Sequence, residues 1–97
     1  KNWDMRKHNA VTELSKKLGI EYIDMNLLGR EIPIDWKRDT RDRGDHMNFT
    51  GAMKVSAYMG EFFASKNVFR DKRNDAMYKN WNDYAAEFAE STGNQLA

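Results

Sequence analysis

The sequence contains no cysteine, one proline, two histidines and no long apolar run in its 97 residues. The lack of cysteine excludes disulfides and thiolate zinc sites, and two histidines without close pairing argue against a transition-metal centre. No apolar run approaches the roughly 20 residues that a membrane-spanning helix needs, and the N-terminus lacks a signal-peptide pattern. We therefore expect no metal or organic cofactor and no membrane span in this chain.

An excess of charge of one sign is also lacking. Sixteen basic and fifteen acidic residues give a formal net charge of +1, which provides no strong field to attract nucleic acid or an anionic membrane. The mixed charges between Lys37 and Arg43 largely neutralise one another and favour a solvated loop. Nucleic-acid binding would require dispersed basic residues to gather on one face, namely Lys7, Lys16, Lys17, Arg38 and Arg41. We expect no nucleic-acid partner.

The chain is long enough for one small domain. Hydrophobic residues make up 40% of it, including three Trp, five Phe and four Tyr, which suffices for a modest core. A complete three-layer α/β domain usually takes about 150 residues or more. Because the sequence also starts with Lys1 and not with Met, we expect residues 1–97 to form a single partial domain of a longer protein.

The first half of the sequence predicts a helix, a short strand and a long loop. Apolar residues recur at helical spacing between Asp4 and Leu18, and Gly19 can adopt the left-handed conformation that ends a helix. Residues 20–25 are rich in strand-forming side chains. Glycine, proline and a dense run of charge make residues 26–47 a long connecting loop, and such loops are often functional.

The second half predicts two further helices. Asn48 is expected to cap a helix that ends near Lys66 and in which Gly51 and Gly60 allow another element to approach closely. A C-terminal helix is expected over residues 71–92, capped by Asp71 and ended by Gly93, with one aromatic face: Met77, Trp81, Tyr84, Ala85 and Phe88. The predicted fold class is therefore an α/β fragment that is predominantly helical, with about three helices and one short strand.

The strongest candidate for chemistry is the segment 42–52, in which carboxylates flank His46 directly before a helix. A neighbouring carboxylate can fix the tautomer of a histidine and make it a general base near neutral pH. Asp42 and Asp45 are the two candidates for that carboxylate. In the competing interpretation His46 is an ordinary loop residue, since acidic residues and glycine are common in turns. His8 has no second ligand at a suitable spacing and is expected to be a solvated surface histidine.

The segment 42–52 resembles the last conserved block of the SGNH (GDSL-like) hydrolases, in which an Asp shortly before a His completes a Ser-His-Asp triad. Residues 21–26 resemble the late strand of that fold, and residues 51–55 resemble the helix after the histidine. The resemblance covers about half of the chain. It implies the C-terminal part of a flavodoxin-like three-layer SGNH fold, with 26–47 as a catalytic-type loop.

The sequence departs from the family pattern in two ways. The position three residues before His46, where the family has its Asp, holds Arg43, so either Asp42 or Asp45 would have to orient the imidazole. The Gly-Asp-Ser block of the family is absent, and no serine of the chain is expected on a strand-to-helix turn. The nucleophile is therefore expected upstream of this chain. Asn48 is interpreted as a helix cap and not as an oxyanion-hole residue.

The resemblance implies a serine-dependent acyl esterase or acyltransferase, to which this chain supplies the general base His46 and its carboxylate. By family analogy the substrate is an acylated polysaccharide or a small ester, and the location is extracytoplasmic or at the cell surface. The alternative is a small helical interaction module, whose aromatic face binds a protein partner and whose histidine has no catalytic role. Exposure of that face would also favour self-association of the isolated chain.

Overall fold

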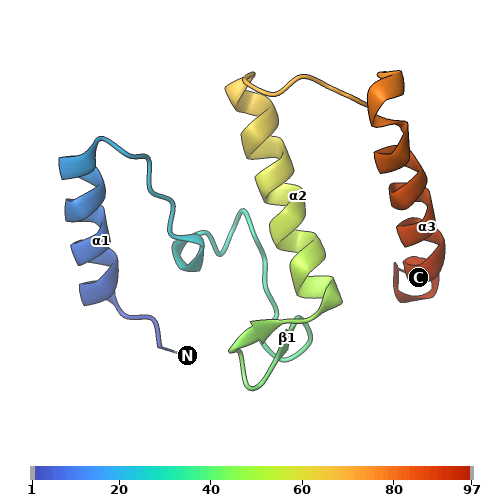
Figure 1. Cartoon of the computed structure of the whole chain (residues 1–97). Helices are drawn as coiled ribbons and strands as arrows, with labels where there is room; N and C mark the ends of the chain where they lie inside the picture. Colours follow the sequence, from blue (N-terminus) through green and yellow to red (C-terminus); the bar gives the residue numbers. More distant parts are fainter. Residues whose placement is uncertain (1, 97) are drawn as a thin grey trace. The chain divides into compact units, whose positions relative to one another are not determined.

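The chain is predominantly helical in a computed structural model that describes residues 2–96 and the side chains of residues 2–93 (Figure 1). The α-helices are α1 (Met5–Leu18), α2 (Phe49–Lys66) and α3 (Lys79–Leu96), the short 3-10 helices are η1 (Met25–Leu27) and η2 (Ala76–Tyr78), and the strands are β1 (Thr40–Arg41) and β2 (His46–Met47). The prediction of a mainly helical chain with about three helices is confirmed.

Helix α1 has the ends that the sequence indicates. The carboxylate of Asp4 accepts a hydrogen bond from the backbone N–H of Lys7 at 3.0 Å, which satisfies one of the free donors of the first turn. Gly19 adopts a left-handed conformation with φ of 66°, and its N–H donates to the carbonyl of Lys16. Lys16 and Lys17 lie in the last turn, at the negative end of the helix dipole. Both ends of this helix are therefore specified by local sequence.

The strand expected over residues 20–25 is wrong. Residues 20–24 are irregular, and η1 follows directly. The Asp24 carboxylate accepts a hydrogen bond from the backbone N–H of Asn26 at 3.0 Å, and this contact begins η1. A strand needs a neighbouring strand to satisfy its backbone groups, and no described segment pairs with residues 20–24.

The chain between η1 and α2 contains a small β-hairpin. Strands β1 and β2 are antiparallel, with Thr40 opposite Met47 and Arg41 opposite His46. The carbonyl of Arg41 accepts hydrogen bonds from the N–H groups of Gly44 at 3.0 Å and Asp45 at 3.2 Å, which closes the turn. The segment interpreted as a long loop therefore ends in a defined hairpin directly before α2.

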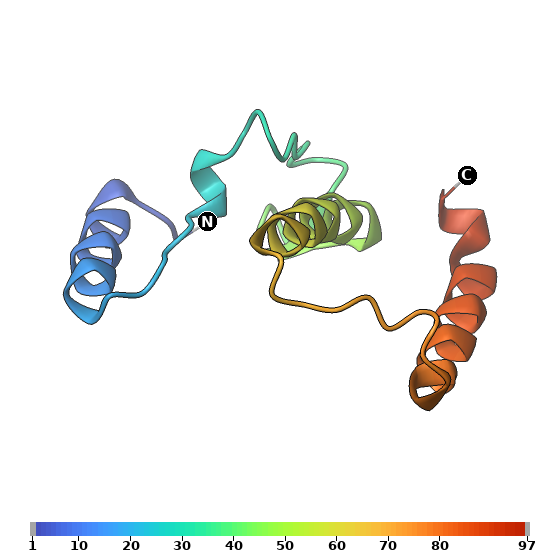
Figure 2. The same cartoon turned by 90° about the horizontal axis from the view of Figure 1, so that it is seen from above.

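Helix α2 begins at the expected cap. The side-chain oxygen of Asn48 accepts a hydrogen bond from the N–H of Gly51 at 3.1 Å. Gly51 is buried, and a Cβ atom there would lie 2.2 Å from the carbonyl oxygen of Asp39, so only glycine fits. A Cβ atom at Gly60 would meet no described atom within 4 Å, and the close approach expected at Gly60 is not found. Figure 2 shows α2 nearly end-on, as one continuous helical ribbon.

Helix α3 begins and ends later than expected. Asp75, and not Asp71, accepts a hydrogen bond from the N–H of Met77 at 3.0 Å and caps η2, which leads into α3 at Lys79. The Asp71 carboxylate instead binds the guanidinium of Arg73. The helix also continues past Gly93 to Leu96, because a glycine inside a helix weakens it without terminating it.

The chain divides into two compact units, Lys1–Tyr58 and Met59–Ala97. Ile32, at 4% exposure, is the sole buried hydrophobic side chain among those described. The aromatic face of α3 is open to solvent, with Trp81 68% exposed and Phe88 57% exposed. Polar contacts more than apolar packing therefore fix the local geometry of the first unit, which carries the hairpin.

Candidate functional site

His46 and Asp42 form a hydrogen-bonded pair at the end of the hairpin. Asp42 follows β1 and His46 opens β2, so the strand register brings these two residues to the same end. The Nδ1 atom of His46 lies 2.7 Å from Oδ2 of Asp42, within the range of a charge-assisted hydrogen bond. Of the two candidate carboxylates, the structure brings Asp42 to the imidazole ring.

The turn that allows this contact has an unusual backbone. Asp42 and Arg43 have φ angles of 53° and 57°, and Gly44 has a φ angle of 93°. The left-handed region is unfavourable for residues with a Cβ atom, by about 1 kcal/mol each, although Asp tolerates it better than most. Strained turns of this kind are concentrated at functional sites, and this one carries the candidate carboxylate.

The geometry of the pair leaves one ring nitrogen of His46 available. The Asp42 carboxylate accepts the Nδ1–H, so the neutral imidazole has its lone pair on Nε2. No described residue makes a hydrogen bond with Nε2. The side chains of His46 and Asp42 are 66% and 62% exposed, so the pair adds little to stability, but Nε2 is accessible to an incoming hydroxyl group. This arrangement can act as a general base.

Asp45, the other candidate carboxylate, makes no side-chain hydrogen bond with the described residues. Its backbone N–H donates to the carbonyl of Arg41, and its side chain is exposed. Arg43, at the position where the family resemblance has an Asp, lies in the same turn. The four residues between β1 and β2 thus let Asp42 face the ring.

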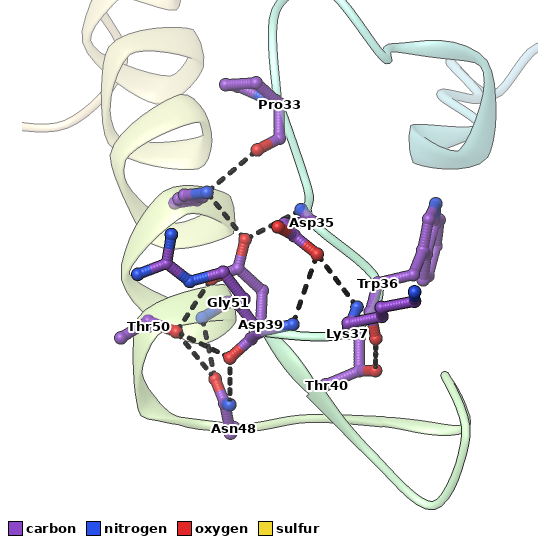
Figure 3. A network of polar contacts seen from close by, with 11 residues as sticks. Pro33, Asp35, Trp36, Lys37, Asp39, Thr40, Asn48, Thr50 and Gly51 are labelled. Carbon is purple, nitrogen blue, oxygen red and sulfur yellow. Dashed lines mark hydrogen bonds and ion pairs between the residues drawn. The ribbon is translucent and has the colours of Figure 1, made fainter.

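A second polar cluster, which we call the Asp39 network, lies at the base of the hairpin (Figure 3). Asp39 is only 3% exposed, although a solvated loop was expected here. Its carboxylate accepts hydrogen bonds from the Lys54 ammonium at 2.6 Å, the Thr50 hydroxyl at 2.7 Å and the Asp35 N–H at 2.8 Å. The Lys54 contact, followed by those of Asp35 and Thr50, lowers the pKa of Asp39 to about 2.

The Asp39 network also holds the backbone on both sides of the hairpin. The N–H of Asn48 donates to the carbonyl of Asp39 at 3.0 Å, and its side-chain amide donates to the carbonyl of Arg38 at 2.6 Å. Lys54 donates in addition to the carbonyl of Pro33 at 2.9 Å. A pocket of about 460 Å³ lies beside the network and is lined by Asp35, Arg38, Asp39, Thr50 and Lys54.

The second histidine is not a solvated surface residue, which corrects the expectation for His8. The Nδ1 atom of His8 lies 3.0 Å from Oδ2 of Asp24, and the two side chains are 20% and 4% exposed. The indole N–H of Trp3 donates to the same oxygen at 2.6 Å, and the Nε2 atom of His8 lies 3.4 Å from the hydroxyl of Thr12. We call these residues the Asp24 clasp, since they join α1 to the segment before η1.

The pKa of Asp24 reflects two opposed effects. Burial acts to raise it, but hydrogen bonds from Trp3, Asn26 and His8 outweigh burial and lower the pKa to about 2. The carboxylate is therefore ionised at neutral pH although it is almost fully buried. Both ring nitrogens of His8 face protein groups, so the Asp24 clasp has the features of a structural contact.

The four serines of the chain all lie within helices, Ser91 included, which was expected near a frayed end. Ser15, Ser65 and Ser91 donate to backbone carbonyls three residues earlier in their helices, and Ser56 lies within α2. None of them is on a strand-to-helix turn, where a nucleophilic serine is exposed. Among the described residues, no group of three or more His, Asp or Glu side chains is arranged to hold a metal ion.

No protein-family model matches the chain, and comparisons with the curated proteins and with solved structures give no match. Within residues 2–96, no helix is both long enough and apolar enough to cross a membrane. The fold and the site thus define a small, predominantly helical chain in which a short hairpin presents an exposed Asp–His pair.

Sequence reasoning missed the roles of Asp39 and Asp24. One signal for Asp39 was present, because Gly51 after a capping Asn48 indicated a close approach of backbone to the helix start. No comparable signal existed for Asp24, whose partner His8 is 16 residues away in sequence. Contacts between distant residues depend on the fold, and the sequence pattern does not contain them.

Proposed function

We propose that this chain is the C-terminal part of a serine-dependent acyl esterase or acyltransferase of the SGNH type, and that it supplies the general base. His46 takes the role of the base, and Asp42 orients it. The nucleophilic serine belongs to a segment outside this chain. The observation that carries the proposal is the 2.7 Å contact between Nδ1 of His46 and Oδ2 of Asp42, together with the accessible Nε2 atom.

The proposed chemistry follows from the protonation states of the pair. Nε2 of His46 accepts the proton of the serine hydroxyl while the serine oxygen attacks the ester carbonyl carbon. The ionised Asp42 stabilises the imidazolium that forms. His46 then returns the proton to the departing alkoxide. The acyl group remains on the serine as an ester. Water or an acceptor hydroxyl releases the acyl group in a second step that again uses His46 as the base.

The substrate class in this proposal comes from the family resemblance. The exposed fractions of His46 and Asp42 are both above 60%, so this chain alone does not enclose the reacting atoms. An acylated polysaccharide or a small ester is the substrate class that the family resemblance suggests, acted on outside the cytoplasm.

The test is hydrolysis of p-nitrophenyl acetate by the longer protein that the proposal requires, with four variants. His46→Ala is expected to lower kcat about a hundredfold or more, since general bases contribute roughly 10²–10⁴ to the rate. Asp42→Asn is expected to lower kcat strongly, and Asp45→Asn to leave it nearly unchanged. His8→Ala is the control that removes the other histidine, whose ring nitrogens both face protein groups, and a folded His8→Ala protein is expected to keep kcat nearly unchanged. Equal rates for folded wild type and His46→Ala would refute the proposal.

A helical interaction module is the second candidate, and the exposure of α3 favours it. Trp81 and Tyr84 of that helix are 68% and 60% exposed, and Met77 of η2, directly before it, is 81% exposed. Such a face is commonly buried against another surface. If it mediates self-association, Trp81→Lys should shift the sedimentation of the 97-residue chain toward the monomer, whereas Lys79→Ala should not. A chain that is monomeric before any substitution would exclude self-association through this face.

A further inference from the structure

The Asp39 network connects the base of the hairpin to α2 through side-chain and backbone hydrogen bonds. We propose that Asp39 is a positioning residue, which holds the base of the hairpin on α2 so that Asp42 and His46 stay at hydrogen-bonding distance. The catalytic meaning of this role rests on the proposed function, whereas the positioning itself is a property of this chain.

The strands cannot fix the Asp–His pair by themselves. Each strand contains two residues, and isolated two-stranded hairpins are only marginally stable in water. Two residues of the turn, Asp42 and Arg43, are also in the unfavourable left-handed region. A contact outside the hairpin must therefore hold the two arms in register.

Asp39 provides that contact through both its side chain and its backbone. Its side chain accepts from Thr50 in the first turn of α2 and from Lys54 one turn later. Its carbonyl accepts the N–H of Asn48 at 3.0 Å, which extends the pairing of β1 and β2 by one step. Asp39, the last residue before β1, thus binds both the residue after β2 and the helix that follows (Figure 3).

The close packing around Gly51 also places the base of the hairpin against α2. A Cβ atom at position 51 would lie 2.2 Å from the carbonyl oxygen of Asp39 and 2.8 Å from the sulfur of Met47. Both arms of the hairpin therefore rest directly on the first turn of α2. Near the turn, the Cε3 atom of Trp36 would be 3.6 Å from a Cβ atom at Gly44.

The tautomer of each imidazole ring shows whether an aspartate is held at its Nδ1 atom. At a pH well above ~6.5 an ordinary imidazole is neutral, and an aspartate on Nδ1 holds the proton on that nitrogen. We expect both histidines of the 97-residue chain to be Nδ1–H, His46 through Asp42 and His8 through Asp24. Two-bond ¹H–¹⁵N correlation spectra of the two rings measure the tautomer of each histidine separately.

Two different perturbations of the network should give the same result. Asp39→Asn removes the charge that binds Lys54, and Gly51→Ala forces the hairpin base away from α2 without changing any polar group. Each is expected to cause His46 to lose the Nδ1–H tautomer while His8 keeps it. The matched controls are Asp24→Asn, which should affect His8 alone, and Gly60→Ala, which lies in open space on the same helix.

Activity of the longer protein separates this proposal from the proposed function. If both are correct, Asp39→Asn lowers kcat by roughly tenfold to a hundredfold and leaves KM nearly unchanged. If the tautomer of His46 changes but His46→Ala has no effect on the rate, positioning stands and the esterase assignment fails. If His46 stays Nδ1–H in a folded Asp39→Asn or Gly51→Ala chain, positioning is wrong. Global unfolding of both variants, measured by circular dichroism, would equally overturn it, because the network would then support the whole fold.

Discussion

Replacing Asp24 with Asn should destabilise the chain in a manner that depends on pH. The Asp24 carboxylate accepts hydrogen bonds from Trp3 at 2.6 Å, from His8 at 3.0 Å and from the backbone and side chain of Asn26. Asparagine keeps the size of the side chain but has one acceptor oxygen and no charge. The substitution therefore leaves donors of the Asp24 clasp without a partner while the packing is retained.

The size of the expected loss in the free energy of unfolding follows from the pKa of Asp24. Folding lowers it from an ordinary value of 3.8 to about 2, and one pKa unit corresponds to about 1.4 kcal/mol. The ionised carboxylate thus contributes about 2 kcal/mol to the free energy of unfolding. The side chain is 4% exposed, so no reduction for solvent screening is needed. For a chain with little apolar core, this is a large share of the total stability.

The sign of the pH dependence follows from the direction of the pKa shift. A carboxylate whose folded pKa is lowered stabilises the fold fully above its unfolded pKa near 3.8 and loses this effect as the pH falls toward 2. We expect urea unfolding, followed by tryptophan fluorescence at several pH values, to give a stability difference between wild type and Asp24→Asn that is constant above pH ~5 and falls by most of the ionic contribution as the pH drops to ~2.

Asp71→Asn is the control that makes this prediction specific. The pKa of Asp71 is also lowered to about 2, by Arg73 two residues away, but both side chains are more than half exposed. A contact this local also forms in the unfolded chain, so it should not change stability. If Asp24→Asn and Asp71→Asn had the same effect, or if the effect of Asp24→Asn did not change with pH, the argument from burial would be refuted.

Thermal unfolding should separate four single substitutions at helix positions. Gly51→Ala is expected to cost more than about 2 kcal/mol because its Cβ atom would lie 2.2 Å from the carbonyl oxygen of Asp39. Gly60→Ala should instead stabilise α2 by up to about 1 kcal/mol. Equal effects of the two substitutions would contradict the close approach of Asp39 to Gly51. Asn48→Ala should cost about 1 kcal/mol through loss of the cap, and a neutral result would exclude that role. Gly19→Ala should cost about 1 kcal/mol because φ is 66°, and an unchanged stability would contradict the left-handed end of α1.

The parts of the fold that depend on local sequence were predictable. Helix α1 has its cap at Asp4 and its end at Gly19, and α2 begins after Asn48, as the residue types indicate. The errors concern the segment 20–25 and Asp71, where the outcome depends on neighbours. A strand requires a partner strand. Several aspartates could cap a helix, and the one that does so is the one whose carboxylate reaches a free backbone N–H group.

The candidate site was likewise predictable where it depends on local sequence, and not where it depends on the fold. Sequence narrowed the partner of His46 to Asp42 and Asp45, because both are within four residues of the ring. The choice between them depends on the left-handed turn at Asp42 and Arg43, which residue type alone does not specify. The Asp39 network includes contacts 11 and 15 residues apart, with Thr50 and Lys54, and contacts of that range arise from the fold.

The two Asp–His pairs of this chain have similar geometry and opposite surroundings, and the difference indicates their roles. In the Asp24 clasp, Nδ1 of His8 meets a buried carboxylate and Nε2 lies 3.4 Å from the hydroxyl of Thr12, so neither nitrogen is available to another molecule. In the hairpin, Asp42 engages Nδ1 of His46 alone, and the ring is 66% exposed. A base must have one nitrogen oriented by the protein and the other accessible to the reacting group. Of the two histidines, His46 meets both conditions, and the exposure that makes its pair weak as a stabilising contact leaves its Nε2 atom free to accept a proton.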